Sequence, residues 1–294
     1  MQIYCVADIV VPVVTPFKGW ELDTEALRLH AENLFRKGVD YVFLSGTTGL
    51  GPALSPEEKL RALEALRDYA DRVIFQVGEL NLERTAELAR KAEDFGVKAI
   101  ASYPVYYFQR IPEKHLIRYF KDICSFTALP VFLYNYPLAT GKDIDARLVE
   151  EIGCLSGVKD TNESLPHTIK YKLRIPRLTV YNGSDSLVFA SLTFLDGTVA
   201  STGNYVPELL VAIKKLVSTK DFEKAMKLQS LLDGLVEVAR KYDSFSANYE
   251  LVRVFQGYSV GKPRPPIYPL EDSEVKALEA EVRTVKEKVA GLTS

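Results

Sequence analysis

Short runs of β-branched and aromatic residues alternate along this chain with longer stretches of helical periodicity. Such alternation is typical of repeated βα units around a parallel sheet. The runs expected to be strands begin at Ile9, Tyr41, Val73, Ala99, Val131, Gly157, Leu178 and Gly197. These eight consecutive units predict an α/β fold, and within that class a closed (β/α)₈ TIM barrel.

An open, doubly wound sheet could use the same alternation, but it usually carries a glycine-rich phosphate loop after its first strand. The segment TPFKGW, at the end of the first expected strand, is not such a loop. Helical periodicity continues after the eighth strand over 206–217, 221–241 and 245–256, and a charged helix is expected from about Glu271. We therefore expect a barrel core over 1–204 and a C-terminal helical appendage, packed on the barrel, over 205–294.

Helix boundaries are marked by capping residues. At Ser55, Ser-Pro-Glu-Glu supplies an N-cap, a proline at the first helical position and carboxylates in the first turn. Asn81 and Asp143 are expected to cap the segments that follow them, while Gly38 and Gly96 stand where helices should end.

The composition indicates an ordinary globular protein. With 294 residues, 47% of them hydrophobic and 26% charged, the chain can bury a sizeable core. A formal net charge of −2 gives no general attraction to nucleic acid or anionic membranes. No signal peptide or membrane-length apolar run is recognisable. We expect a cytoplasmic protein with a small-molecule substrate and with no nucleic-acid or membrane partner.

The cysteines and histidines indicate neither a disulfide framework nor a metal site. Cys5, Cys124 and Cys154 are far apart and form no CxxC pair, which suits a reducing compartment better than a disulfide scaffold and leaves at least one of them unpaired. The three histidines, which we expect to be packing or surface residues, are His30, His115 and His167. No cluster with metal-ligand spacing stands at the strand ends.

Active sites of (β/α)₈ barrels lie at the C-terminal ends of the strands. Those ends are unusually polar in this chain. They carry Thr15, Gly46-Thr47-Thr48-Gly49, Tyr134-Asn135-Tyr136, Lys159-Asp160-Thr161 and Ser184-Asp185.

Lys159 lies in a strand that a parallel barrel would bury on both faces. Desolvation lowers the pKa of a lysine, so a neutral amine becomes available to attack a carbonyl carbon. The alternative is a structural ion pair with Asp160 or another barrel carboxylate, although adjacent strand residues face opposite ways. Lys159 is therefore a candidate nucleophile.

Two further elements would enter the barrel mouth beside Lys159. Tyr134, one βα unit earlier, could transfer protons, or it could fill the barrel top with its hydroxyl bonded to a loop. The stretch Gly46-Thr47-Thr48-Gly49 could cradle a carboxylate with backbone donors and two hydroxyls, or it could be a turn whose threonines cap a helix.

Taken together, the motifs GTTGLGPALS, LYNYPLATG and GVKDT resemble the class I pyruvate-dependent aldolases, that is, the dihydrodipicolinate synthase and N-acetylneuraminate lyase superfamily. The resemblance spans nearly the whole chain. It is strongest to the archaeal 2-keto-3-deoxygluconate aldolase branch, several members of which also act on the 6-phosphate.

The resemblance implies a role for each motif residue. Lys159 would form the Schiff base, Tyr134 would move protons, and Thr47 and Thr48 would hold the pyruvyl carboxylate. Tyr107 in PVYYFQR matches a tyrosine that the family sends into the neighbouring subunit's site, which implies at least a dimer, with tetramers (dimers of dimers) usual. Neither metal nor organic cofactor is implied.

The remaining substrate-binding candidates lie at strand ends and in the C-terminal helices. Those expected to bind substrate at the strand ends are Thr161, Gly183, Asp185 and Ser201. Those that could reach a terminal phosphate are Tyr136, Arg110, Arg240 and Ser244. For Arg110 and Arg240, a solvated surface position is the alternative.

The sequence departs from other branches of the superfamily at two places. Leu50 replaces the glutamate of GTTGE, and Leu138 and Ala139 stand where the synthase has an arginine for its second substrate's carboxylate. Both departures match the ketodeoxygluconate aldolase pattern. We therefore expect reversible cleavage of 2-keto-3-deoxygluconate, and of its 6-phosphate, to pyruvate and an aldehyde, as in the Entner–Doudoroff pathway. The alternatives are a dihydrodipicolinate synthase-like condensing enzyme and a non-catalytic sugar-acid binding protein.

Overall fold

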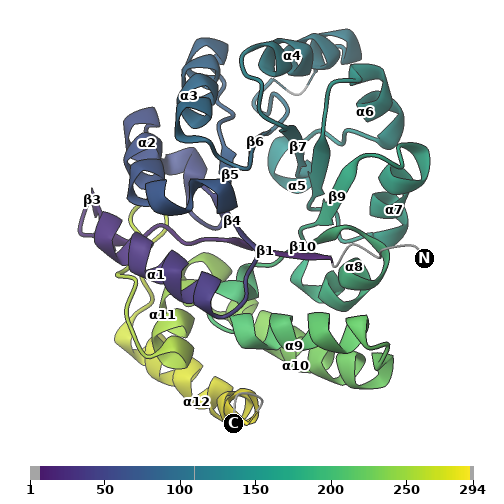
Figure 1. The fold of residues 1–294 in the computed structure, drawn as a ribbon. Helices are drawn as coiled ribbons and strands as arrows, with labels where there is room; N and C mark the ends of the chain where they lie inside the picture. Colours follow the sequence, from purple (N-terminus) through teal and green to yellow (C-terminus); the bar gives the residue numbers. More distant parts are fainter. Residues whose placement is uncertain (1–6, 109, 292–294) are drawn as a thin grey trace.

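The computed structural model describes residues 7–108 and 110–291 and closes the eight expected strands into a parallel barrel (Figure 1). The barrel strands are β1 (Asp8–Pro12), β4 (Tyr41–Leu44), β5 (Val73–Gln76), β6 (Ala99–Ser102), β7 (Val131–Asn135), β8 (Gly157–Asp160), β9 (Thr179–Asn182) and β10 (Gly197–Val199). Pairing of β10 with β1 completes the ring. The predicted TIM barrel is thus confirmed, and the open sheet is excluded.

Helices follow the barrel strands and surround them (Figure 1). The α-helices are α1 (Thr24–Arg36), α2 (Pro56–Ala65), α3 (Leu82–Phe95), α4 (Glu113–Ser125), α5 (Pro137–Thr140), α6 (Ala146–Ile152), α7 (Leu165–Arg174), α8 (Val188–Phe194), α9 (Pro207–Ser218), α10 (Phe222–Lys241), α11 (Ser244–Gln256) and α12 (Asp272–Ala290). Short 3₁₀ turns are η1 (Gly51–Ala53), η2 (Arg67–Arg72), η3 (Asp185–Leu187) and η4 (Ser201–Asn204). The sequence did not predict the small antiparallel hairpin of β2 (Phe17–Lys18) and β3 (Glu21–Leu22).

Alternate residues of the strands fill two separate apolar regions. Val10, Phe43 and Tyr134 belong to a cluster inside the barrel. Ile9 and Leu44, which neighbour two of them in sequence, belong to the larger cluster between strands and helices. This division follows from the two-residue repeat of a β-strand. Because aromatic and aliphatic side chains fill the interior, substrate space is expected only at an end of the barrel.

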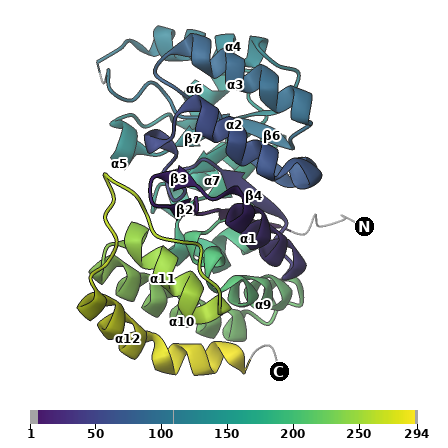
Figure 2. The same cartoon turned by 90° about the vertical axis from the view of Figure 1, so that its left-hand side faces the viewer.

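The C-terminal helices extend from the ring of barrel helices into an outer layer. Helix α9 contacts α8 and β1, and ion pairs Lys37–Glu208 and Lys214–Asp40 join it to the segment between α1 and β4. Helix α10 packs on α9, and α11 and α12 pack on α10 (Figure 2). Helix α9 thus takes the position of the eighth barrel helix. The division at residue 204 remains a prediction.

The capping predictions hold except at one position. Ser55 forms a reciprocal capping box with Glu58, Asn81 accepts hydrogen bonds at the start of α3, and Gly96 ends α3 in the left-handed conformation. The cap predicted at Asp143 is wrong, because α6 begins later and Asp145 accepts its first-turn hydrogen bond from Leu148.

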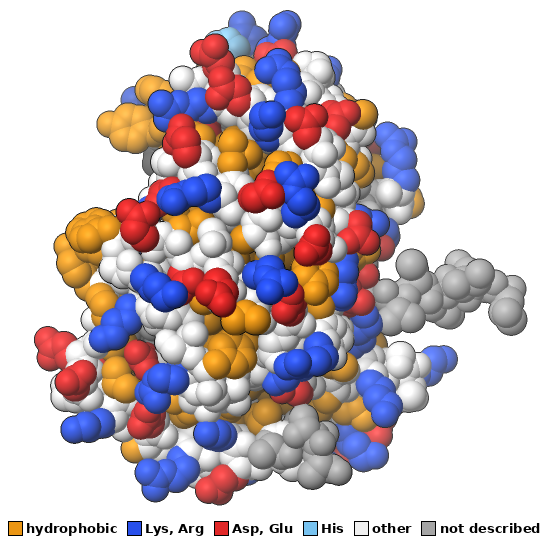
Figure 3. Space-filling model, turned by 60° about the vertical axis from the view of Figure 1, so that its left-hand side comes forward, with side chains coloured by type: hydrophobic (Ala, Val, Ile, Leu, Met, Phe, Trp, Pro, Cys, Tyr) orange, Lys and Arg blue, Asp and Glu red, His pale blue; other side chains and the backbone are white. Residues whose placement is uncertain are grey.

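The histidines are packing or surface residues, as predicted. His30 is buried between Tyr258 and Asn204, and burial lowers its pKa to about 4. His115 is exposed on α4. Positive and negative side chains are interspersed over the face drawn in Figure 3. No helix within residues 7–108 and 110–291 is long and apolar enough to cross a membrane.

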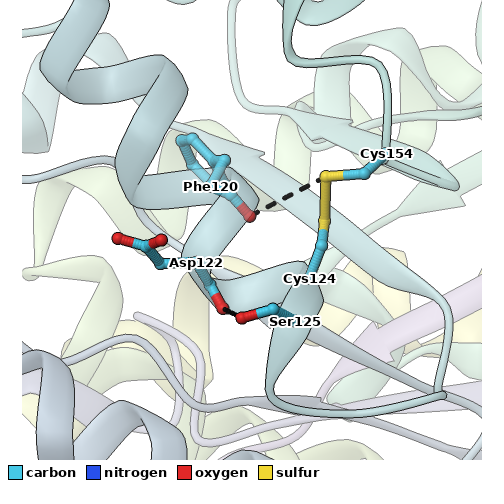
Figure 4. The surroundings of a disulfide bond; sticks show 5 residues. All are labelled: Phe120, Asp122, Cys124, Ser125 and Cys154. Carbon is cyan, nitrogen blue, oxygen red and sulfur yellow. Dashed lines mark hydrogen bonds between the residues drawn. A yellow bond between two sulfur atoms is a disulfide. The ribbon is translucent and has the colours of Figure 1, made fainter.

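The cysteine prediction requires correction. Cys124 at the end of α4 and Cys154 in the loop before β8 form a disulfide, with their Cα atoms 6.4 Å apart and a sequence separation of 30 (Figure 4). Folding brings α4 against α6, so cysteines that are distant in sequence become neighbours. The third residue, Cys5, lies outside the described residues, as does the whole segment 1–6.

Replacing Cys124 and Cys154 together by serine should lower the free energy of unfolding by about 3 kcal/mol, because this cross-link restricts the unfolded chain. Unfolding in guanidinium chloride measures the change, and reduced wild-type protein should lose a similar amount. A double variant as stable as the oxidised wild type would contradict a stabilising disulfide.

Candidate active site

A cavity of about 490 Å³ lies where the carboxyl ends of the barrel strands face α10 and α11. The site residues predicted from the sequence that line it are Thr47, Thr48, Tyr134, Tyr136, Lys159, Thr161, Gly183, Asp185, Ser201, Arg240 and Ser244. They come from segments spread over some 200 positions of the chain, so only the closed barrel brings them together. Tyr107 and Arg110 do not line it.

Lys159 projects from β8 into the cavity and is only 4% exposed. Its Nζ lies 3.7 Å from the ring centre of Tyr134 and 4.4 Å from that of Phe43. No side chain of the described residues forms an ion pair or hydrogen bond with this Nζ, which excludes a structural pair with Asp160. Burial lowers the pKa of Lys159 to about 7, against the opposing charge of Asp185. A large share of neutral amine is therefore present near neutral pH.

Tyr134 is level with Lys159 in the pairing of β7 with β8. Its hydroxyl lies 3.0 Å from Thr47 Oγ1, which is also 3.3 Å from the hydroxyl of Tyr103. Burial raises the pKa of Tyr134 to about 12, so the phenol keeps its proton at neutral pH. Tyr134 both packs the barrel top and meets a loop hydroxyl, and it does so directly beside the amine.

Tyr103 is a site residue that the sequence analysis missed. Its ring stacks on that of Tyr134 with centres 4.7 Å apart. Its position directly after β6 was the available signal, since side chains at strand ends face the barrel mouth.

The loop that carries Thr47 and Thr48 is tightly wound. Ser45 and Leu50 adopt left-handed backbone conformations, with φ of 58° and 55°. A Cβ on Gly51 would lie 1.8 Å from the carbonyl oxygen of Ser45, so only glycine fits there. The threonines cap no helix, because the N-caps of η1 and α2 are Leu50 and Ser55. The cap alternative is therefore excluded.

The floor of the cavity beside Lys159 is polar. The hydroxyl of Thr161 is buried, and its interaction with the phenol of Tyr134 opposes the rise in the pKa of that phenol. A Cβ on Gly183 would lie 2.6 Å from that hydroxyl, so glycine keeps the space open. Asp185 accepts hydrogen bonds from Ser201 at 2.7 Å and from Thr202 at 2.6 Å, which fixes its carboxylate.

The mouth of the cavity holds three of the four candidates for a terminal phosphate, and Arg110 is the exception. The ring of Tyr136 stacks on that of Tyr134 with centres 6.2 Å apart. Arg240 donates to Glu163, a lining residue that the sequence analysis missed. Tyr107 is 75% exposed, and Arg110 is exposed near it, both outside the cavity of their own chain.

A row of polar side chains on the outward face of β7, β8 and β9 holds the carboxyl ends of these strands in place. Asn135, Asp160 and Asn182 are level with one another on β7, β8 and β9 and follow the inward-facing Tyr134, Lys159 and Tyr181. Asp160 accepts hydrogen bonds from Asn135 at 2.9 Å and from Thr168 of α7 at 2.6 Å, and Thr168 accepts from Asn182. This network couples the three strands to α7.

Comparison with known proteins assigns the family. The Dihydrodipicolinate synthetase family model matches residues 6–285, and the chain belongs to this family. A "2-dehydro-3-deoxy-phosphogluconate/2-dehydro-3-deoxy-6-phosphogalactonate aldolase" of Saccharolobus solfataricus is 50% identical over 295 residues, covering 99% of this chain and 96% of the relative. A "2-dehydro-3-deoxy-D-gluconate/2-dehydro-3-deoxy-phosphogluconate aldolase" of Thermoproteus tenax is 52% identical over 283 residues, covering 96% and 92%.

Solved structures give the same relationship. KD(P)GA from T. tenax superposes with a TM-score of 0.93 at 52% identity, covering 96% of this chain and 99% of that one. The 2-keto-3-deoxygluconate aldolase of Sulfolobus solfataricus in complex with D-KDPG superposes with a TM-score of 0.95 at 49% identity, covering 97% and 98%.

His167 stabilises the hydrogen-bond network of Asn135, Asp160 and Asn182 in a pH-dependent way. Its ring nitrogens lie 3.0 Å from carboxylate oxygens of Asp160 and of Asp143. The hydrogen bond with Asp160 raises the pKa of His167, while burial opposes the shift. Because the pKa of His167 is higher in the folded state than in the unfolded state, its protonation stabilises the fold. This stabilisation is fully present below about pH 6.5 and is lost as the pH rises through the folded-state pKa.

His167→Gln should therefore lower the free energy of unfolding most at mildly acidic pH, and the loss should shrink at alkaline pH. Denaturant unfolding of both proteins across this range measures the difference. The exposed His115 provides a control, since His115→Gln should leave the profile unchanged. A loss for His167→Gln that is constant with pH would contradict a charged imidazole between two carboxylates.

Proposed function

We propose that this chain is a class I Schiff-base aldolase. It reversibly cleaves 2-keto-3-deoxygluconate to pyruvate and glyceraldehyde, and the 6-phosphate to pyruvate and glyceraldehyde 3-phosphate. The observation that carries the proposal is the buried Nζ of Lys159, which has no counter-ion among the described residues and faces Tyr134 in a cavity. The aldolase names of relatives about 50% identical over nearly the full chain support the same assignment.

The reaction begins with the neutral amine of Lys159 attacking the C2 carbonyl carbon of the keto acid. Loss of water gives an iminium, which accepts the electron pair of the C3–C4 bond as that bond breaks. The aldehyde leaves, and an enamine of pyruvate remains on Lys159. Protonation of the enamine at C3 and hydrolysis of the resulting iminium release pyruvate. The iminium is the electron sink, so the proposal includes neither metal nor organic cofactor.

Tyr134 moves the proton of this reaction. The C4 hydroxyl loses a proton as the bond breaks, and C3 of the enamine gains one, so a single proton shuttled between them balances the step. Because the phenol of Tyr134 is neutral at pH 7, it takes this proton while passing its own to Thr47 Oγ1, 3.0 Å away, and the proton of Thr47 passes in turn to the substrate carboxylate that this hydroxyl holds. The same hydrogen bond returns the proton to the enamine.

The other cavity residues bind substrate. Thr47 and Thr48, with the backbone amides of their loop, hold the carboxylate. The buried hydroxyl of Thr161 and the carboxylate of Asp185 face the sugar hydroxyls, with Ser201 and the open space at Gly183 beside them. Tyr136, Arg240 and Ser244 contact the terminal phosphate at the mouth.

The assembly is part of the proposal. The chain forms a homotetramer arranged as a dimer of dimers in the cytoplasm, and Tyr107 completes the proton relay in the neighbouring subunit's site. The support is that Tyr107 is 75% exposed and lies outside the cavity of its own chain. Arg110, exposed on the same loop, reaches the phosphate from there.

The two rival functions are less well supported. A dihydrodipicolinate synthase is expected to have an arginine in the loop after Tyr134 for its second substrate's carboxylate, whereas Leu138, 89% exposed, stands there at the cavity rim. A non-catalytic binding protein would have no need of a desolvated lysine beside a tyrosine and two threonines. Trapping of pyruvate without cleavage of the sugar acid would favour that second rival.

Borohydride reduction in the presence of pyruvate tests the nucleophile. The intact mass of the wild-type chain should increase by one reduced pyruvyl unit, and that of Lys159→Ala should not. Lys59 is a matched control, because it is also buried but is paired with Glu79 outside the cavity, so Lys59→Met should still form the adduct. An adduct on Lys159→Ala, or none on the wild type, would remove Lys159 from the mechanism.

A further inference from the structure

The charged side chains that line the cavity balance one another. They are Lys159, Glu163, Asp185 and Arg240. When Lys159 is neutral, as attack on a carbonyl requires, these groups carry a net negative charge. A substrate with a carboxylate at one end and a phosphate at the other therefore depends strongly on Arg240, the cationic lining residue that stays charged.

Arg240 already has an anionic partner. Its Nη2 lies 2.7 Å from Oε1 of Glu163, and the two side chains are 57% and 71% exposed. Arg240 is in the last turn of α10, and Glu163 is in the loop between β8 and α7, next but one to Thr161. The pair therefore spans the opening of the cavity.

Tyr136 faces the same pair. Burial is the main cause of the raised pKa of Tyr136. The negative charge of Glu163 raises this pKa further, and the positive charge of Arg240 lowers it. Glu163, Arg240 and the Tyr136 hydroxyl are therefore within electrostatic range of one another, at the position where the far end of an extended substrate anchored on Lys159 would lie.

We infer that Glu163 is a specificity-determining residue that discriminates against phosphorylated substrate by occupying Arg240. This inference rests on the proposed function. A phosphate reaching Arg240 must displace the carboxylate from the guanidinium and is also repelled by it. A substrate that ends in a hydroxyl group does not need to displace the Glu163 carboxylate and is not repelled by it. Because exposed ion pairs are weak, Glu163 reduces the preference for phosphate without excluding it.

A purely structural role for the pair would give a different result. The ion pair also ties the loop of Thr161 to α10, so losing it could loosen the site for every substrate. Glu163→Gln keeps the size of the side chain and a carbonyl oxygen that can accept from Arg240, while it removes the charge. Damage to the loop would change both substrates alike, whereas loss of competition would change the phosphorylated substrate alone.

The experiment compares kcat and KM for 2-keto-3-deoxygluconate and its 6-phosphate in wild type and Glu163→Gln. In Glu163→Gln, KM for the phosphorylated substrate should fall about fivefold, which is the order expected for an exposed charge. The kcat for that substrate should not change, and neither should kcat or KM for 2-keto-3-deoxygluconate. The difference should shrink as salt is added. Glu150→Gln is the matched control, since Glu150 forms an exposed pair with Arg174 away from this cavity and should change nothing.

Inorganic phosphate gives a second measurement that needs no turnover of a phosphorylated substrate. As an inhibitor of 2-keto-3-deoxygluconate cleavage, it should bind Glu163→Gln about fivefold more tightly than wild type. An unchanged ratio between the two substrates with unchanged phosphate inhibition would overturn the inference, and so would an equal loss for both substrates. If wild type trapped no pyruvate and cleaved neither substrate, the proposed function itself would fail.

Discussion

The burial of one lysine without a counter-ion in the described part of the chain is the constraint on which the rest of the site depends. A second lysine shows what the usual solution would be: Lys59 is 1% exposed, and its ammonium is paired with Glu79. Lys159 is 4% exposed and has aromatic faces, not a carboxylate, around its Nζ. The charged form therefore loses hydration without recovering it in an ion pair, and the neutral amine is favoured. This desolvation cost is borne at Lys159, the residue that we propose as the nucleophile.

Such a site requires rigid strands, because an amine and a phenol act together only when their separation is fixed. The inward-facing Tyr134 and Lys159 are each followed by an outward-facing polar residue, Asn135 and Asp160. Asn135 donates to Tyr171 of α7, and Asp160 accepts from Thr168 of the same helix, so both strand ends are held at one level. Because adjacent strand residues face opposite ways, each dipeptide presents a proposed catalytic side chain on one face and a supporting polar side chain on the other. The charge of Asp160 is thereby satisfied away from Lys159.

The barrel and most of the cavity could be predicted because their signals are local. Each strand is a contiguous run, and Lys159, Tyr134 and Thr47 stand at strand ends, where barrel geometry places the site. What could not be predicted depends on contacts between distant segments. The Cys124–Cys154 disulfide and the Arg240–Glu163 ion pair join residues that only the folded chain brings together. Tyr103 was missed because an aromatic residue at a strand end is as typical of packing as of function.

The pKa of the Lys159 side chain tests most directly whether desolvation makes this amine a nucleophile. It can be measured by NMR titration of protein carrying ¹³C at the lysine Cε. Comparison with Lys159→Met assigns the resonance. We expect titration near pH 7 in the absence of substrate, well below the ordinary lysine value of about 10.4. Titration at or above that ordinary value would mean that the ammonium is stabilised at neutral pH, and it would contradict the claim that desolvation makes Lys159 a nucleophile.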